Sequence, residues 1–127
     1  DIGVSRSFLQ HEIPGIEILI EEGAEPDIAR RIMHGQMEEQ YGNGDGIYLP
    51  VGIEGMILTY CDMSFNTSLM SIEERVEDIK ERVSRLKDAT PERKNDIIVN
   101  IDKAYPRYKA YERIVFLISG VDSFKDF

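Results

Sequence analysis

The sequence predicts an all-α fold, and three observations lead to that prediction. Apolar residues recur at intervals of three and four along most of the chain, which is the spacing of one helix face. Several of these segments begin at a proline or at a Ser-x-x-Glu sequence, both of which favour helix starts. No segment shows the apolar/polar alternation that is typical of a strand.

Composition sets the class of protein. The 127 residues are 42% hydrophobic and 31% charged, which indicates one soluble domain. A net charge of −9 gives no overall attraction to nucleic acid or to an anionic membrane, and no apolar run is long enough to span a bilayer. The single cysteine, Cys61, cannot form an internal disulfide. We therefore expect a cytoplasmic protein that has no membrane partner and no bulk nucleic-acid binding.

The first two helices are expected to form a hairpin. Pro14 opens the first and Gly23 ends it, and Pro26 begins the second. Their apolar faces consist of Ile13, Ile16, Leu19 and Ile20 in the first helix, and Ile28, Ala29, Ile32, Met33 and Met37 in the second. The glycine-rich stretch "YGNGDGIY" then predicts a flexible connection to the rest of the chain.

A central helix is expected between Leu49 and Phe65, where apolar residues point in every direction, as in a helix surrounded by protein. After it, Ser71 and Glu74 form a capping-box signature. The next helix has the apolar stripe Ile72, Val76, Ile79, Val83 and Leu86, with Asp78/Arg82 and Glu81/Arg85 placed for ion pairs.

The last helical segment begins at Thr90-Pro91. Its first apolar stripe is Ile97, Ile98, Ile101, Ala104 and Tyr105, after which Pro106 is expected to kink or break the helix. Helical spacing then continues through Tyr108, Tyr111, Val115 and Ile118 to Gly120.

Asp62 is the charged residue of the central helix that most needs an explanation. Only Glu54 shares its ionic character in that helix, and an ionised carboxylate among apolar neighbours is costly unless a cation or donors meet it. Helix chemistry alone favours an ion pair with a neighbouring arginine, or a carboxylate at a partly wet helix edge. A metal ligand is the alternative.

Two histidines add possible nitrogen ligands to the metal-site alternative. Taken singly, His11 is typical of a residue near a helix start and His34 of a surface residue. Together with Asp1 and Asp62 they form a mixed nitrogen and oxygen set, which suits Mn²⁺, Fe, Co or Mg²⁺ better than a thiol-rich zinc site does.

Three stretches, "DIGVSR", "HEIPGIEILIEEGAEPDIARRIMHGQ" and "LPVGIEGMILTYCDMSF", resemble in order and spacing the HD-domain metal-dependent phosphohydrolases with a His-Asp-Ile-Gly motif. The resemblance covers about residues 1–85, and Asp1 to Gly3 match the last three residues of that motif. The chain thus begins inside the motif, as expected of a processed chain or a piece of a longer one. The other residues at motif positions are Arg6, His11, His34 and Asp62.

The resemblance implies an HD-domain-like helical bundle. Residues 1–88 would be an HD-type domain without its N-terminal helices, and residues 89–127 a C-terminal helical extension packed on the same domain. The family's motif histidines upstream of Asp1 are not in this chain, so we expect this polypeptide alone to bind metal poorly and to be inactive. Met63 stands where a lysine often follows the last aspartate.

The implied activity is metal-dependent hydrolysis of a nucleotide-like phosphomonoester or phosphodiester. In that assignment the metal ligands are Asp1, His34 and Asp62, the catalytic residues are Asp1, His11 and His34, and the phosphate-binding residues are Arg6, His11 and His34. The cofactor is a divalent metal, namely Mn, Fe, Co, Ni or Mg, and the partner is a small phosphorylated or nucleotide substrate. Two alternatives stay open: a non-catalytic HD-derived regulatory or scaffolding module, and a plain helical interaction domain. A second copy of the chain, in a homodimer, is a further candidate partner.

Overall fold

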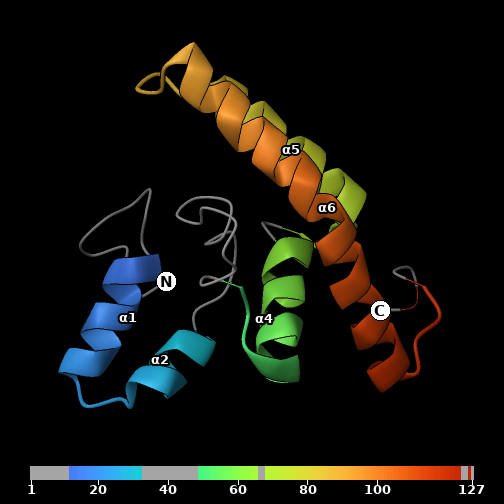
Figure 1. Ribbon diagram of the computed structural model, residues 1–127. Helices are drawn as coiled ribbons and strands as arrows, with labels where there is room; N and C mark the ends of the chain where they lie inside the picture. Colours follow the sequence, from blue (N-terminus) through green and yellow to red (C-terminus); the bar gives the residue numbers. More distant parts are fainter. Residues whose placement is uncertain (1–11, 33–48, 66–67, 124–125, 127) are drawn as a thin grey trace.

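The structure, a computed structural model, describes residues 12–32, 49–65, 68–123 and 126. Regular structure in these ranges is helical, so the predicted all-α class is confirmed. In Figure 1, α4 lies in the middle, α1 and α2 on one side of it, and the long α5–α6 hairpin extends from its other side. The helices are α1 (Glu12–Glu21), α2 (Pro26–Ile32), α4 (Gly52–Ser64), α5 (Ile72–Ser84) and α6 (Pro91–Ser119).

Helices α1 and α2 pack against each other as the predicted hairpin. Gly23 ends α1 with φ of 98°, and the Ala24 amide donates to the Leu19 carbonyl at 2.8 Å, which closes the helix end in a left-handed turn. Ala29 is fully buried, whereas Ile28 is 52% exposed. The prediction that Ile28 shares a buried face was therefore wrong, because α2 packs through Ala29 and the preceding side chain points about 100° away. Met33 and Met37 lie outside the described residues.

Helix α4 packs against α2, α5 and α6, but it is not surrounded by protein. Thr59, Tyr60 and Met63 form its buried face, while Ile53 is 54% exposed and Leu58 is 38% exposed. The sequence-based expectation was wrong here, because apolar residues around a helix do not by themselves require burial of every side.

Helix α5 agrees with its prediction in each feature. The Glu74 amide donates to the Ser71 hydroxyl at 3.1 Å and the Ser71 amide donates to the Glu74 carboxylate at 2.8 Å, which completes the capping box. The stripe from Ile72 to Val83 is buried and Leu86 is partly buried. The predicted Asp78–Arg82 pair forms at 3.0 Å, and Glu81 pairs with Arg85.

Helix α6 begins at the predicted cap, where the Thr90 hydroxyl accepts from the Arg93 amide at 3.2 Å. It runs without a break through Pro106 to Ser119, so of the two predicted outcomes, a kink or a break, the break does not occur. Pro106 has no amide hydrogen to complete the helical ladder, and Figure 1 shows the helix axis bending near its middle. Gly120, with φ of 71°, ends the helix as predicted.

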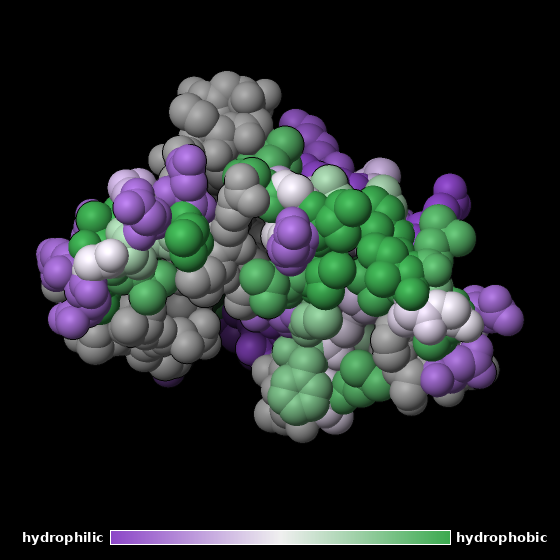
Figure 2. All heavy atoms as spheres, turned by 90° about the horizontal axis from the view of Figure 1, so that it is seen from below, coloured by the Kyte–Doolittle hydropathy of each residue, from purple (hydrophilic) through white to green (hydrophobic). Residues whose placement is uncertain are grey.

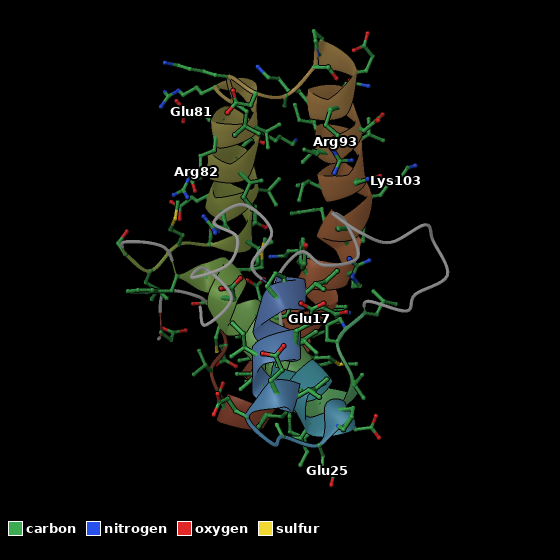
Figure 3. The ribbon with its side chains drawn as sticks, turned by 90° about the vertical axis from the view of Figure 1, so that its left-hand side faces the viewer. Glu17, Glu25, Glu81, Arg82, Arg93 and Lys103 are labelled. Carbon is green, nitrogen blue, oxygen red and sulfur yellow. The ribbon has the colours of Figure 1, made fainter. Side chains whose placement is uncertain are left out.

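The hydrophobic core lies where α4, α5 and α6 meet. Figure 3 shows α5 and α6 side by side, with Arg82 and Lys103 pointing outward from the pair. Across this seam Lys80 pairs with Asp102 at 2.6 Å and Lys109 pairs with Glu73 at 2.9 Å. The core cluster consists of Tyr60, Met63, Ile72, Val76, Ile79, Val83, Ile101, Ala104, Tyr108, Tyr111 and Val115. Among the described helices, none combines the length and the apolar character needed to cross a membrane.

Candidate functional site

Asp62 lies in the last turn of α4 and is half buried. With helical steps of about 100°, its side chain leaves the helix between the buried Thr59 and the exposed Leu58. The carboxylate therefore stands at the border of the core, neither enclosed by it nor fully in solvent. The prediction that it faces a polar cleft beside Asp1 falls on Asp1, which lies outside the described residues.

Asp62 and two arginines, one from α5 and one from α6, influence the ionisation of the same buried tyrosine, Tyr108. Burial raises the pKa of the Tyr108 hydroxyl well above its ordinary value, the guanidinium charges of Arg107 and Arg75 oppose that rise, and the charge of Asp62 adds to it. The Arg107 guanidinium carbon lies 5.6 Å from the centre of the Tyr108 ring. The carboxylate of Asp62 and two guanidinium groups thus act on the same buried phenol.

This junction also contains buried polar atoms without hydrogen-bond partners in the described structure. They are the Thr59 hydroxyl, the Tyr108 hydroxyl and the Nε of Arg75, whose Nη1 donates to Asp78 at 2.7 Å. Buried groups of this kind are commonly satisfied by internal water. The end of α4 therefore adjoins a polar interior in which both donors and acceptors are available.

Sequence reasoning missed the contribution of Arg75, Arg107 and Tyr108 to the surroundings of Asp62. Tyr108 was identified as part of the apolar stripe of α6, and its depth in the core is confirmed by an exposed fraction of 1%. The arginines carried no spacing signal that connects them to Asp62, because they meet it only through the packing of α5 and α6 on α4. In the sequence, an arginine next to a core tyrosine was the one hint that a positive charge lies beside the core.

The remaining site residues of the sequence analysis, Asp1, Arg6, His11 and His34, lie outside the described residues. The structure does place the helices next to two of them, since α1 starts one residue after His11 and α2 ends two residues before His34. In Figures 1 and 3 the start of α1 and the end of α4 lie at a similar height in the molecule, below the tip of the α5–α6 hairpin. Helix α2 packs directly against α4.

Within residues 12–32, 49–65, 68–123 and 126, no group of three or more His, Cys, Asp or Glu side chains is arranged to hold a metal ion. No protein-family model, curated protein or solved structure matches this chain. Asp62, the described member of the expected ligand set, offers carboxylate oxygens at the border of the core, which is suitable chemistry for Mn²⁺ or Mg²⁺.

Proposed function

We propose that the protein is a metal-dependent phosphohydrolase that acts on a nucleotide-like phosphomonoester or phosphodiester. The observation that supports this proposal is the similar height of the start of α1 and the end of α4 in the molecule. Asp62 lies in the last turn of α4, and His11 directly precedes the start of α1 in the sequence. This placement agrees with the order of motif residues that the sequence shares with the HD-domain phosphohydrolases.

In the proposed site Asp62, Asp1 and His34 hold the divalent metal, and Arg6, His11 and His34 bind the substrate phosphate. A bound divalent metal would neutralise phosphate charge and lower the pKa of a water ligand, which could then attack phosphorus. Arg6 offers a guanidinium fork that matches phosphate oxygens, and the histidines can donate to them or exchange protons near neutral pH.

Met63 cannot supply a positive charge to the proposed site. It stands where related motifs often have a lysine, and here its side chain is fully buried in the core cluster. A cation at this position would be buried, so the position serves packing in this chain. In the proposed mechanism, the stabilisation of phosphate charge therefore depends on Arg6, the histidines and the metal.

The test compares two carboxylates of the same helix. In the protein as encoded, Asp62→Ala should lower Mn²⁺- or Co²⁺-dependent hydrolysis of a generic phosphodiester and phosphomonoester by more than about 100-fold, since even residues behind a metal ligand contribute about 10–100-fold. Metal content, measured by elemental analysis, should fall in parallel. Glu54→Ala is the matched control, because Glu54 is exposed on the same helix and should leave both measurements unchanged.

A regulatory or scaffolding helical module is the second candidate. The charges of Arg75 and Arg107, which act together with Asp62 on the Tyr108 hydroxyl, favour it, because guanidinium groups can pair with a carboxylate without any metal. In that case Asp62→Ala would change the free energy of unfolding but not metal content. Absence of hydrolysis with Mn²⁺, Fe²⁺, Co²⁺, Ni²⁺ and Mg²⁺ would contradict the enzyme proposal.

A further inference from the structure

Five consecutive apolar residues, from Ile114 to Ile118, lie near the end of α6. Val115 faces the core and Phe116 packs partly against it, with its ring meeting the edge of the Tyr60 ring at a centroid distance of 6.2 Å. Leu117 and Ile118 point away from the core and are 77% and 60% exposed. Adjacent exposed apolar side chains often mark a site of protein–protein contact.

A pocket of about 460 Å³ lies beside the exposed Leu117. Leu117 and Phe116 supply apolar walls, and Arg113 and Asp122 stand on its lining as opposite charges. Neither Arg113 nor Asp122 forms an ion pair with any residue of the described ranges, although both belong to one pocket. The same small region therefore presents a protruding apolar side chain, a pocket, and two opposite charges that have no ion-pair partner among the described residues.

Exposed apolar residues of α4 extend this region. The start of α4 and the end of α6 lie at the same end of the molecule in Figure 1. Figure 2 views that end from below and shows apolar side chains gathered over it. Val51 is 45% exposed and Ile53 is 54% exposed there. We call Val51, Ile53, Leu117, Ile118 and the adjoining pocket the terminal patch.

We propose that the terminal patch is the interface of a homodimer, in which two copies of this chain pack about a two-fold axis at the ends of their α6 helices. A two-fold interface needs a surface that is complementary to itself. The terminal patch meets this condition, because Leu117 of each copy can enter the pocket of the other. The same symmetry brings each Arg113 toward the partner's Asp122.

Charge explains why a second copy is the occupant that fits. The chain carries a net charge of −9, so two copies repel each other unless they meet through a surface that is largely uncharged and internally balanced. The described pocket lining has two cations, Lys109 and Arg113, and two anions, Glu112 and Asp122. Lys109 pairs with Glu112 within the chain, which leaves Arg113 and Asp122 for crossed pairs. Each crossed ion pair contributes little energy by itself but fixes the relative position of the two helices.

Leu117→Glu is the principal test, read by sedimentation velocity and by light scattering over a concentration series. The wild-type chain should dimerise, and the variant should weaken dimerisation by at least about 30-fold, the effect of removing one central interface residue. Val99→Glu is the matched control, because Val99 is exposed on α6 outside the terminal patch. It should leave the dimer unchanged, and circular dichroism should show equal helix content in both variants.

Charge exchange tests the two-fold arrangement independently. Arg113→Asp alone and Asp122→Arg alone should each weaken the dimer, and the double variant should recover most of the loss. A wild-type chain that stays monomeric at about 1 mM, where even weak association is visible, overturns the proposal. A dimer that tolerates Leu117→Glu and both single charge changes overturns it equally, because its interface must then lie elsewhere.

Discussion

The α4–α5–α6 core and the α1–α2 hairpin are both built from helices with apolar faces, yet they bury those faces to different degrees. Every member of the core cluster comes from α4, α5 or α6. In the hairpin the buried residues that the structure describes are small, Gly15 and Ala29, while Ile20 and Ile28 are largely exposed. Similar apolar patterns therefore contribute very different stabilities, because the partner surface decides how much area is buried.

This difference separates stability from the proposed chemistry. The folding free energy should be concentrated where the three long helices meet. The proposed histidines adjoin the hairpin in the sequence, whereas Asp62 lies at the border of the core. We expect the hairpin to open locally at a lower free-energy cost than the core, because fewer buried apolar contacts hold it closed.

The largest expected effect comes from shortening one isoleucine in each region and comparing the two losses of stability. Ile101→Ala should lower the free energy of unfolding by about 2–5 kcal/mol, because Ile101 is 1% exposed and its loss leaves a cavity in the core. Ile28→Ala, in the hairpin, should change it by less than about 0.5 kcal/mol. Urea unfolding followed by circular dichroism measures both values. Equal losses in the two variants would show that the hairpin is anchored as firmly as the core.

Much of the core could be predicted from the sequence because its signals are local. The capping box at Ser71 and the proline after Thr90 each specify a helix start within one turn, and the stripe from Ile72 to Val83 specifies a buried face. Local signals could not decide between a kink and a break of α6 at Pro106. There, tertiary packing on α4 and α5 keeps the helix continuous despite one missing hydrogen bond.

The surroundings of Asp62 show which part of the candidate site could not be predicted from the sequence. Sequence reasoning selected Asp62 because a charge stands among apolar residues, and the half-buried position agrees with that concern. It could not select Arg75 and Arg107, since contacts between three helices have no fixed spacing along a chain. The exposed side of α4 was missed for the same reason. The positions of Ile53 and Leu58 in the sequence do not indicate which other helices pack against them.

High pH offers a second way to examine the core. Burial raises the pKa of Tyr108 above its ordinary value, so the folded protein keeps this proton at pH values where the unfolded chain releases it. The contribution is fully present below about pH 10, the ordinary tyrosine value, and is lost as pH rises toward the folded value. We expect the free energy of unfolding to fall above about pH 10, with tyrosinate absorbance appearing together with unfolding.

Tyr108→Phe isolates this contribution. At neutral pH it should cost less than about 1 kcal/mol, because the hydroxyl has no hydrogen-bond partner in the described structure and its removal leaves the ring packing intact. Above about pH 10 the variant should lose stability less steeply than the wild type. Some loss should persist, because ion pairing raises the pKa of Lys80 as well. An unchanged pH dependence would mean that Tyr108 ionises within the folded core.

The smallest expected effect concerns the ion pair that joins α5 to α6 across the surface of the core. Lys80 and Asp102 lie 2.6 Å apart, but 55% of the Asp102 side chain is exposed, so solvent weakens their attraction. A double-mutant cycle with Lys80→Ala and Asp102→Ala should give a coupling of about 0.2–1 kcal/mol, which falls when salt is raised to about 1 M.

The matched control is Glu81 with Arg85, a more exposed pair within α5 that should couple by about 0.3–0.5 kcal/mol. If the Lys80–Asp102 coupling approached the loss caused by Ile101→Ala, the seam between α5 and α6 would depend on charge as much as on burial. A coupling within the expected range would assign the stability of this region to the apolar contacts beneath the pair.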